Sequence, residues 1–200
     1  MKNPFRLISD SFGFGKFSDF FSELKNIQVV VDHFLFETPL GASKEEDVHF
    51  QLVRQGFEEL FKRNEEYFAN LKRQIVEDPD SFSFQIDWQK LGPNDRFVVQ
   101  YDLEKAKNEV IESGQFLSEY VYALTDPPYS LQCGGDEEKR AVGVRAPKTL
   151  LGDVNKFSIR KWSNDWSNYF DAGNEWWGAF LWTLVSDDGE GWWIGASTTD

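Results

Sequence analysis

The sequence has very few of the residues on which disulfide-linked and metal-bound proteins depend. Its 200 residues include one cysteine, Cys133, and two histidines, His33 and His49. A single cysteine excludes an intramolecular disulfide, which fits a reducing compartment. Neither histidine belongs to a His-x-x-x-His or Cys-x-x-Cys pattern, so we expect no zinc site. Nothing in the spacing brings a histidine near Cys133, so we interpret this thiol as a small buried hydrophobic group.

Long apolar runs and nucleotide-binding motifs are also absent. No stretch approaches the ~20 apolar residues that a membrane-spanning helix needs, and the first residues lack the apolar segment of a signal peptide. We therefore expect a cytoplasmic protein that does not bind a membrane. There is no Gly-x-x-x-x-Gly-Lys loop and no Gly-x-Ser-x-Gly motif, and Gly13-Phe14-Gly15 lacks the third glycine of a dinucleotide site. These absences predict no cofactor and favour a protein that is not an enzyme.

Positive charge is scarce as well. Lys and Arg number 21 against 34 Asp and Glu, which gives a formal net charge of −13. Such a surface repels phosphate backbones, so we expect no nucleic-acid partner. The same field would steer a basic protein toward the chain.

Aromatic residues, in contrast, are abundant. The apolar fraction is 40%, and the chain has 19 Phe and 8 Trp. This content suffices for a packed core, and the length suits one domain over residues 1–200. Because rings are rigid and have few rotamers, the core must satisfy strict shape demands.

Helical and strand periods alternate along the chain. Apolar residues recur at helical spacing in three segments, residues 17–24, 48–75 and 103–124. Ser43 and Glu46 form a capping box before the second segment. Strict alternation predicts one hairpin over 82–102 and another from strands 176–185 and 191–197, joined through Asp188-Gly189.

Three further segments are less regular. Ile27 to Phe36 fits either a strand or a helix, because its β-branched residues also keep helical spacing. We interpret residues 1–15 as an irregular segment whose phenylalanine rings dock on the domain. Residues 129–156 are the least patterned part, and we expect a surface loop there that includes the charged run Asp136 to Arg140. The whole pattern predicts an α+β protein, with an antiparallel sheet built from at least two hairpins and helices packed mainly on one face.

The last 39 residues differ most from the rest. Residues 162–200 contain no Lys or Arg but hold seven of the eight tryptophans and seven acidic residues. Because side chains alternate between the faces of a strand, each strand of the terminal hairpin carries tryptophan on both faces. Either both faces are covered by other elements, or an aromatic face remains open for a partner.

The open face would form a contact surface of indole rings bordered by carboxylates. Large rigid rings dominate binding hot spots, and acidic side chains would select a cationic partner. The candidate partner-binding residues are Trp176, Trp177, Trp192, Trp193, Asp171, Glu175, Asp187, Asp188 and Glu190. The leading hypothesis is therefore a non-enzymatic protein that sequesters a basic protein partner, as bacterial immunity proteins do with toxins.

Two alternatives use the same residues. A carbohydrate-binding or other small-ligand protein, or a hydrolase, would stack its ligand on the terminal tryptophans and use Asp171 or Glu175 as a polar group. A structural subunit would instead bury its aromatic face in a homodimer.

Overall fold

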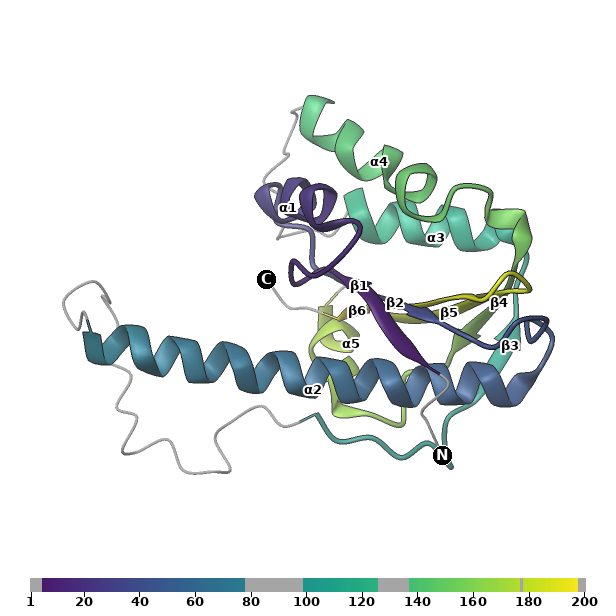
Figure 1. The fold of residues 1–200 in the computed structure, drawn as a ribbon, viewed down its shortest axis with the longest axis horizontal. Helices are drawn as coiled ribbons and strands as arrows, with labels where there is room; N and C mark the ends of the chain where they lie inside the picture. The colour runs from purple at the N-terminus through teal and green to yellow at the C-terminus, as the bar shows by residue number, and fades with distance from the viewer. Residues whose placement is uncertain (1–4, 78–98, 126–136, 177, 198–200) are drawn as a thin grey trace.

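The computed structural model describes residues 5–77, 99–125, 137–176 and 178–197. Six strands form one sheet in the order β1-β2-β6-β5-β4-β3, and every neighbouring pair is antiparallel (Figure 1). The strands are β1 (Arg6–Asp10), β2 (Val31–Glu37), β3 (Asn108–Val110), β4 (Phe157–Trp162), β5 (Ala179–Ser186) and β6 (Glu190–Ser197). The predicted α+β class with an antiparallel sheet is confirmed.

Helices cover both faces of the sheet (Figure 1). On one face lie α1 (Ser18–Asn26), α3 (Ser113–Thr125) and α4 (Glu137–Leu151). On the other lie α2 (Glu46–Glu77) and the short α5 (Asp171–Trp176), with the 3₁₀ turn η3 (Asn168–Phe170), while a second 3₁₀ turn, η2 (Val154–Lys156), precedes β4. The sheet is thus the middle layer of three. No helix in the described ranges is both long and apolar enough to cross a membrane.

The terminal hairpin occupies the centre of the sheet. β5 and β6 pair with each other and are flanked by β4 and β2, so neither is an edge strand. Gly189 has a φ of +87° in the connecting turn, as the Asp188-Gly189 pair predicts. Trp182 and Trp192 pack in the core beneath α1, α3 and α4, whereas Trp193 packs in the core beneath α2. Because side chains alternate between the two faces of the strands, the tryptophans of the hairpin lie in two separate cores.

Trp193 fits beneath α2 because glycines leave room for its indole. A Cβ at Gly56 of α2 would lie 2.2 Å from Trp193 Cδ1, and one at Gly195 would lie 2.4 Å from Cη2. Both distances are far below van der Waals contact, so an indole can occupy this space only where the neighbouring residues lack side chains. The ring contacts Phe34 and Phe57 edge-on, with centroids 5.4 and 5.5 Å away.

Several predicted elements are confirmed. The first two helical segments correspond to α1 and α2. Ile27 to Phe36 resolves as a strand, because Val31–Glu37 pairs in register with Glu190–Ala196 of β6. The predicted hairpin over 82–102 lies mostly outside the described residues.

Other expectations are wrong. Residues 6–10 form β1 rather than irregular structure, because they pair with β2. The helix expected over 103–124 begins only at Ser113, since Asn108–Val110 pairs with β4 as an edge strand. Part of the loop expected over 129–156 is α4, which packs closely on α3 where Gly143 meets Leu124 and Thr125. Pairing and packing with distant residues override the local pattern in each case.

Candidate functional site

The two tryptophans of the predicted surface whose side chains the structure describes are not open to solvent. Trp192 and Trp193 are each 0% exposed, so neither indole is available for a surface contact. Trp162 and Trp166 are 3% and 4% exposed, and Trp182 is 0% exposed. The physical reason is that helices cover both faces of the hairpin. The side chains of Trp176 and Trp177, the other two predicted aromatic contacts, lie outside the described residues.

The predicted carboxylates of the β5–β6 turn bind residues of the same molecule. Asp187 accepts a hydrogen bond from the backbone N–H of Ser43 at 3.3 Å, and hydrogen bonds from Ser43 lower the Asp187 pKa. Asp188 accepts from Ser186, which lowers its pKa in turn. Lys156 forms ion pairs with both Glu190 and Asp188. These three carboxylates stabilise a turn and are partly neutralised.

Asp171 lies apart from that turn. It begins α5 rather than lying in the predicted loop, because Gly173 N–H binds Ser197 Oγ at 3.0 Å and fixes the turn against β6. Asp171 lines a polar hollow of about 500 Å³ together with Asp102 and Asp165. The side chain of Glu175 is outside the described residues. The described carboxylates predicted for one surface are thus divided between two places.

Exposed aromatic rings are found near the amino-terminal end of the chain. Phe12 and Phe14 are 46% and 49% exposed, and Tyr67 of α2 is 61% exposed. Phe12 and Tyr67 line the same cavity, and Phe14 belongs to the same short loop as Phe12. An exposed pair of Phe rings is unusual, because large apolar side chains normally leave water on folding.

The loop that carries these rings, residues 10–15, is held rigidly by a buried carboxylate. Asp10 is 0% exposed, and its Oδ1 accepts the backbone N–H groups of Phe12 at 3.0 Å and Phe14 at 3.1 Å. Its Oδ2 accepts two bonds from Arg63 of α2, at 2.7 and 3.1 Å. Gly13 and Gly15 take positive φ angles that let the loop turn tightly. The exposed rings are therefore presented by a pre-organised backbone.

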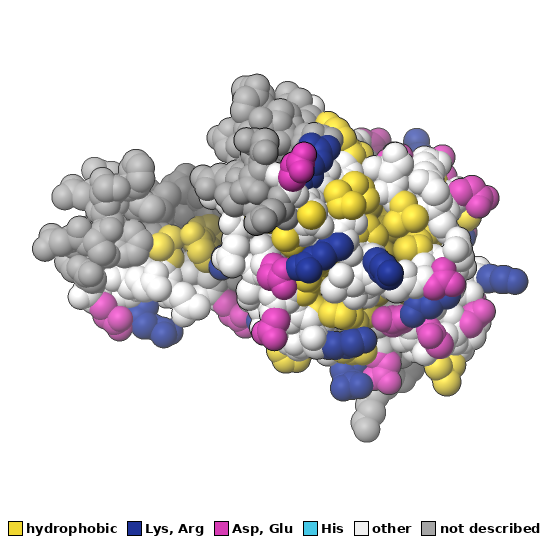
Figure 2. Space-filling model, turned by 90° about the horizontal axis from the view of Figure 1, so that it is seen from above, with side chains coloured by type: hydrophobic (Ala, Val, Ile, Leu, Met, Phe, Trp, Pro, Cys, Tyr) yellow, Lys and Arg dark blue, Asp and Glu magenta, His cyan; other side chains and the backbone are white. Residues whose placement is uncertain are grey.

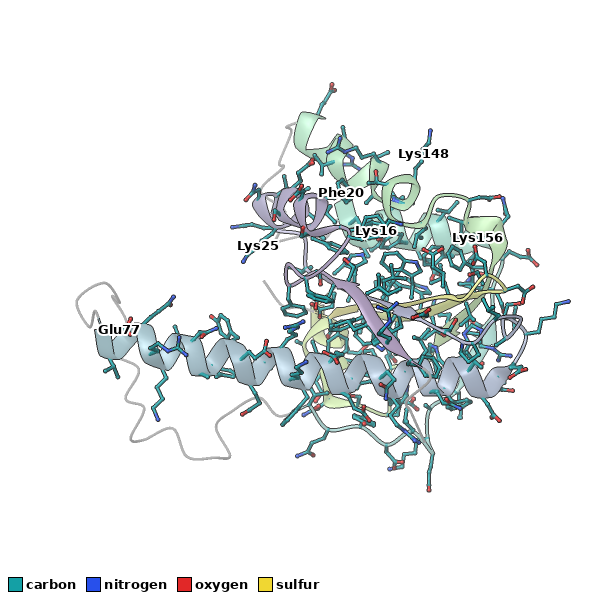
Figure 3. All side chains as sticks on the ribbon, viewed as in Figure 1. Lys16, Phe20, Lys25, Glu77, Lys148 and Lys156 are labelled. Atoms are coloured by element: carbon teal, nitrogen blue, oxygen red, sulfur yellow. The ribbon has the colours of Figure 1, made fainter. Side chains whose placement is uncertain are left out.

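A cavity of about 670 Å³ opens beside this loop, between the end of α1, the start of β2 and the middle of α2. We call it the α1–α2 cavity. Figure 3 shows Lys25 at the end of α1, and Glu77 at the far end of α2. The side chains of the cavity that concern its chemistry are Phe12, Phe21, Lys25, Asp32, Glu66 and Tyr67. Its size falls within the range of about 300–1,000 Å³ for ligand pockets.

Asp32 is the more buried of the two carboxylates that line this cavity, since Glu66 is exposed. Burial raises its pKa to about 6, although a hydrogen bond from Tyr169 acts in the opposite direction. Tyr169 Oη–H donates to Oδ2 at 3.0 Å, and burial together with Asp32 raises the pKa of Tyr169 well above its ordinary value. The side chain still keeps partial contact with solvent. Among the described residues, Asp32 forms no ion pair with a cationic side chain.

The nearby guanidinium is bound elsewhere. Arg63 also lines the cavity, but its nitrogens bind Asp10 and Glu66. Partial burial lowers the Arg63 pKa, yet the bonds to these carboxylates outweigh it and raise the pKa overall. Asp32 is thus a deep carboxylate supported by one neutral donor, and its charge is not balanced by Arg63.

The histidines are structural. His33 Nε2 lies 2.6 Å from Tyr120 Oη, and burial lowers the pKa of His33 to about 3. His49 Nδ1 lies 2.8 Å from Thr183 Oγ1, and burial lowers its pKa to about 4. Both imidazoles are therefore neutral core groups. In the described part of the chain, no three His, Cys, Asp or Glu side chains are grouped to hold a metal ion. Cys133 lies outside the described residues.

Sequence reasoning missed the cavity, although one signal pointed to it. Asp32 is the only acidic residue in the mostly apolar run from Ile27 to Phe36. A charge within a buried strand is expensive unless it has a partner or a function. Comparisons with protein-family models, with curated proteins and with solved structures found no match to this chain.

Proposed function

We propose that the protein is a non-enzymatic binding protein that captures a basic protein partner on the surface formed by the residue 10–15 loop and the α1–α2 cavity. The observation that carries this proposal is a pair of exposed rings, Phe12 and Tyr67, that line the same cavity as Asp32, a partly buried carboxylate that has no cationic partner in the described residues. The proposal keeps the partner class that the sequence suggests and replaces the tryptophan hairpin as its site.

The exposed rings suit a protein contact. Aromatic residues are enriched in protein interfaces and bury a large area at small entropic cost. Because Asp10 and Arg63 fix the loop, Phe12 and Phe14 need little further ordering on binding. Pre-organisation of this kind raises affinity by reducing the entropy lost on association.

The charge distribution favours a basic partner. The chain carries −13 overall, which accelerates the approach of a positively charged protein. Figure 2 shows that the α1, α3 and α4 face carries acidic and basic side chains side by side. Arg145 there pairs with Glu23, for example. Proteins that neutralise a basic toxin in the cell that makes it are one class with this chemistry.

The test compares partners captured by the folded protein and by matched variants. We expect the double variant Phe12→Ala/Phe14→Ala to lose a basic protein that the unaltered chain captures. Val144→Ala is the control, because Val144 is 53% exposed on α4, away from the cavity. Titration of the purified partner should show affinity that falls with rising salt. Equal capture by the double variant, or salt-independent binding, would contradict the proposal.

A second candidate function is supported by the polar hollow at Asp171. Its lining combines Asp102, Asp165 and Asp171 with three asparagines, and Tyr101 there is 38% exposed. Amide and carboxylate groups beside a ring suit a hydroxyl-rich small ligand such as a carbohydrate. A glycan array with an Asp171→Asn variant tests this, and it is supported only if a sugar bound by the unaltered chain is lost.

A further inference from the structure

The geometry points to Asp32 as the receptor for one primary ammonium group on an aliphatic stem, that is, a lysine side chain inserted into the α1–α2 cavity. In naming a protein partner's lysine, the inference rests on the proposed function. The recognition chemistry is independent of it and applies equally to a free alkylamine.

The hydrogen bonding of the Asp32 carboxylate suits a ligand that makes one contact. Oδ2 accepts Tyr169 Oη–H at 3.0 Å, whereas no donor from the described residues binds Oδ1. One oxygen therefore remains for a ligand. A planar guanidinium binds best through two parallel bonds to both carboxylate oxygens, but an ammonium needs only a single point of contact. The bond from Tyr169 engages one of the two lone pairs of Oδ2 and crowds that side of the carboxylate, so a single contact through Oδ1 suits an ammonium better than a guanidinium.

The cavity that contains Asp32 also offers apolar surface. Phe12 and Tyr67 provide the exposed apolar surface of the cavity, whereas Phe21, Leu24 and Val31 at its α1 end are almost fully buried. Lysine buries its methylene chain along such surfaces while its charged end reaches a polar group. A ring close to the ammonium adds a cation–π attraction. The cavity therefore matches both parts of the side chain.

The charged groups facing the cavity come from three helical elements. Lys25 of α1 opposes a cationic ligand, Glu66 of α2 attracts it, and Arg63 of α2 is bound by Asp10 and Glu66. Tyr169 of η3 remains a neutral donor, because its pKa is raised. The affinity for a cationic ligand therefore depends mainly on the Asp32 carboxylate. Lys25 lowers this affinity and Glu66 raises it.

Binding should depend on pH in a defined direction. The Asp32 pKa is about 6 in the empty protein, so the carboxylate is charged at pH 7.5 and mostly protonated at pH 5. An ammonium ligand stabilises the charged form and lowers this pKa on binding. Affinity should therefore fall as pH decreases through about 6.

The test uses n-butylammonium and Nα-acetyl-lysine methylamide as probes on the full chain, followed by NMR. We expect chemical-shift changes around Asp32 and a lowered Asp32 pKa at saturation. Asp32→Asn should weaken binding roughly 10- to 100-fold, as expected for the loss of a charged hydrogen-bond partner. Lys25→Gln should tighten binding, and Glu109→Gln, exposed on β3 at the opposite edge of the sheet from β1, should leave it unchanged.

The opposite results are equally informative. If n-butanol binds as well as n-butylammonium, if Asp32→Asn binds equally, or if methylguanidinium binds more tightly, the inference is overturned. These outcomes leave the proposed function standing, because that is tested separately through Phe12 and Phe14. Conversely, ammonium binding at Asp32 without any basic protein partner would support the receptor and contradict the proposed function.

Discussion

The β5–β6 hairpin and the residue 10–15 loop are both rich in aromatic residues, but their rings have opposite environments. Trp182, Trp192 and Trp193 are fully buried, whereas Phe12 and Phe14 are about half exposed. The hairpin lies at the centre of the sheet between two helical layers, and the loop follows the edge strand β1. Aromatic density alone therefore does not identify a contact surface, because the position of the strand in the sheet decides which rings meet water.

The two regions also differ in how charge is used. Carboxylates of the hairpin turn bind Ser43, Ser186 and Lys156 and so support the fold. Beside the α1–α2 cavity, Asp10 holds a loop, whereas Asp32, which lines the cavity, has only a neutral donor among the described residues. A carboxylate with an unbalanced charge beside exposed rings is a better indicator of binding than a count of acidic residues.

The largest expected effect is at the centre of the hairpin. Trp193→Ala removes a ring that is 0% exposed and packed against Phe34 and Phe57. We expect a loss of about 4 kcal/mol in the free energy of unfolding, measured by urea denaturation. Leu40→Ala is the control, since Leu40 is 80% exposed. A loss below about 1 kcal/mol would show that Trp193 contributes little to the core, and the contrast between a buried hairpin and an exposed loop would not hold.

The next effect concerns the support of the loop. Arg63→Ala leaves the fully buried Asp10 without its cationic partner, and we expect destabilisation of about 3 kcal/mol. Arg73→Ala, on the exposed part of the same helix, should change stability little. Equal unfolding curves for Arg63→Ala and the unaltered chain would mean that the loop does not depend on this ion pair.

A smaller effect of opposite sign is expected at Asp32. Because its pKa is raised from 3.8 to about 6 in the folded protein, the folded state binds the proton more tightly than the unfolded state. Its contribution to stability is present at low pH and is lost as pH rises through about 6. Asp32→Asn should therefore stabilise the protein by about 2 kcal/mol at pH 7.5.

The pH dependence of that gain is the control. The advantage of Asp32→Asn should vanish near pH 4, where the unaltered carboxyl is protonated. Thermal unfolding of Asp32→Asn and of the unaltered chain, at pH 4 and at pH 7.5, measures the stability difference at each pH. A variant less stable than the unaltered chain at pH 7.5 would assign Asp32 a structural role instead of a binding role.

The smallest effect on stability is expected at the exposed rings. Phe12 stacks on Phe34 with centroids 5.9 Å apart, and Phe14 is 49% exposed. Phe12→Ala/Phe14→Ala should lower the free energy of unfolding by about 1 kcal/mol, far less than Trp193→Ala. Denaturation of the two variants side by side tests the comparison. Similar losses would mean that the loop rings belong to the core.

The local pattern predicts the hairpin and the long helix well, because strict alternation and a broad helical stripe are strong signals. It does not predict α4, because a glycine and a proline, which weaken a helical signal, belong to its buried face of Gly143, Ala146, Pro147, Leu150 and Leu151. It also cannot predict that helices cover both faces of the hairpin, since this depends on contacts between residues far apart in the chain.

The site was harder to predict for the same reason. Asp10 and Arg63 are 53 residues apart, and Asp32 meets Tyr169 across 137 residues, so no spacing rule connects them. The aromatic loop is visible in the sequence as Phe12 and Phe14, each followed by a glycine, but its exposure depends on its position at the edge of the folded sheet. Only the isolated charge of Asp32 could have directed attention to the cavity.

The glycines around Trp193 have a consequence for sequence variation. Positions 56, 193 and 195 share one volume, so they are expected to change as a group. An alanine at Gly56 alone collides with the indole, but the same alanine should be accepted once leucine replaces Trp193. In a combinatorial library selected for folding, the residues at these three positions should covary, although they lie on two elements far apart in the chain.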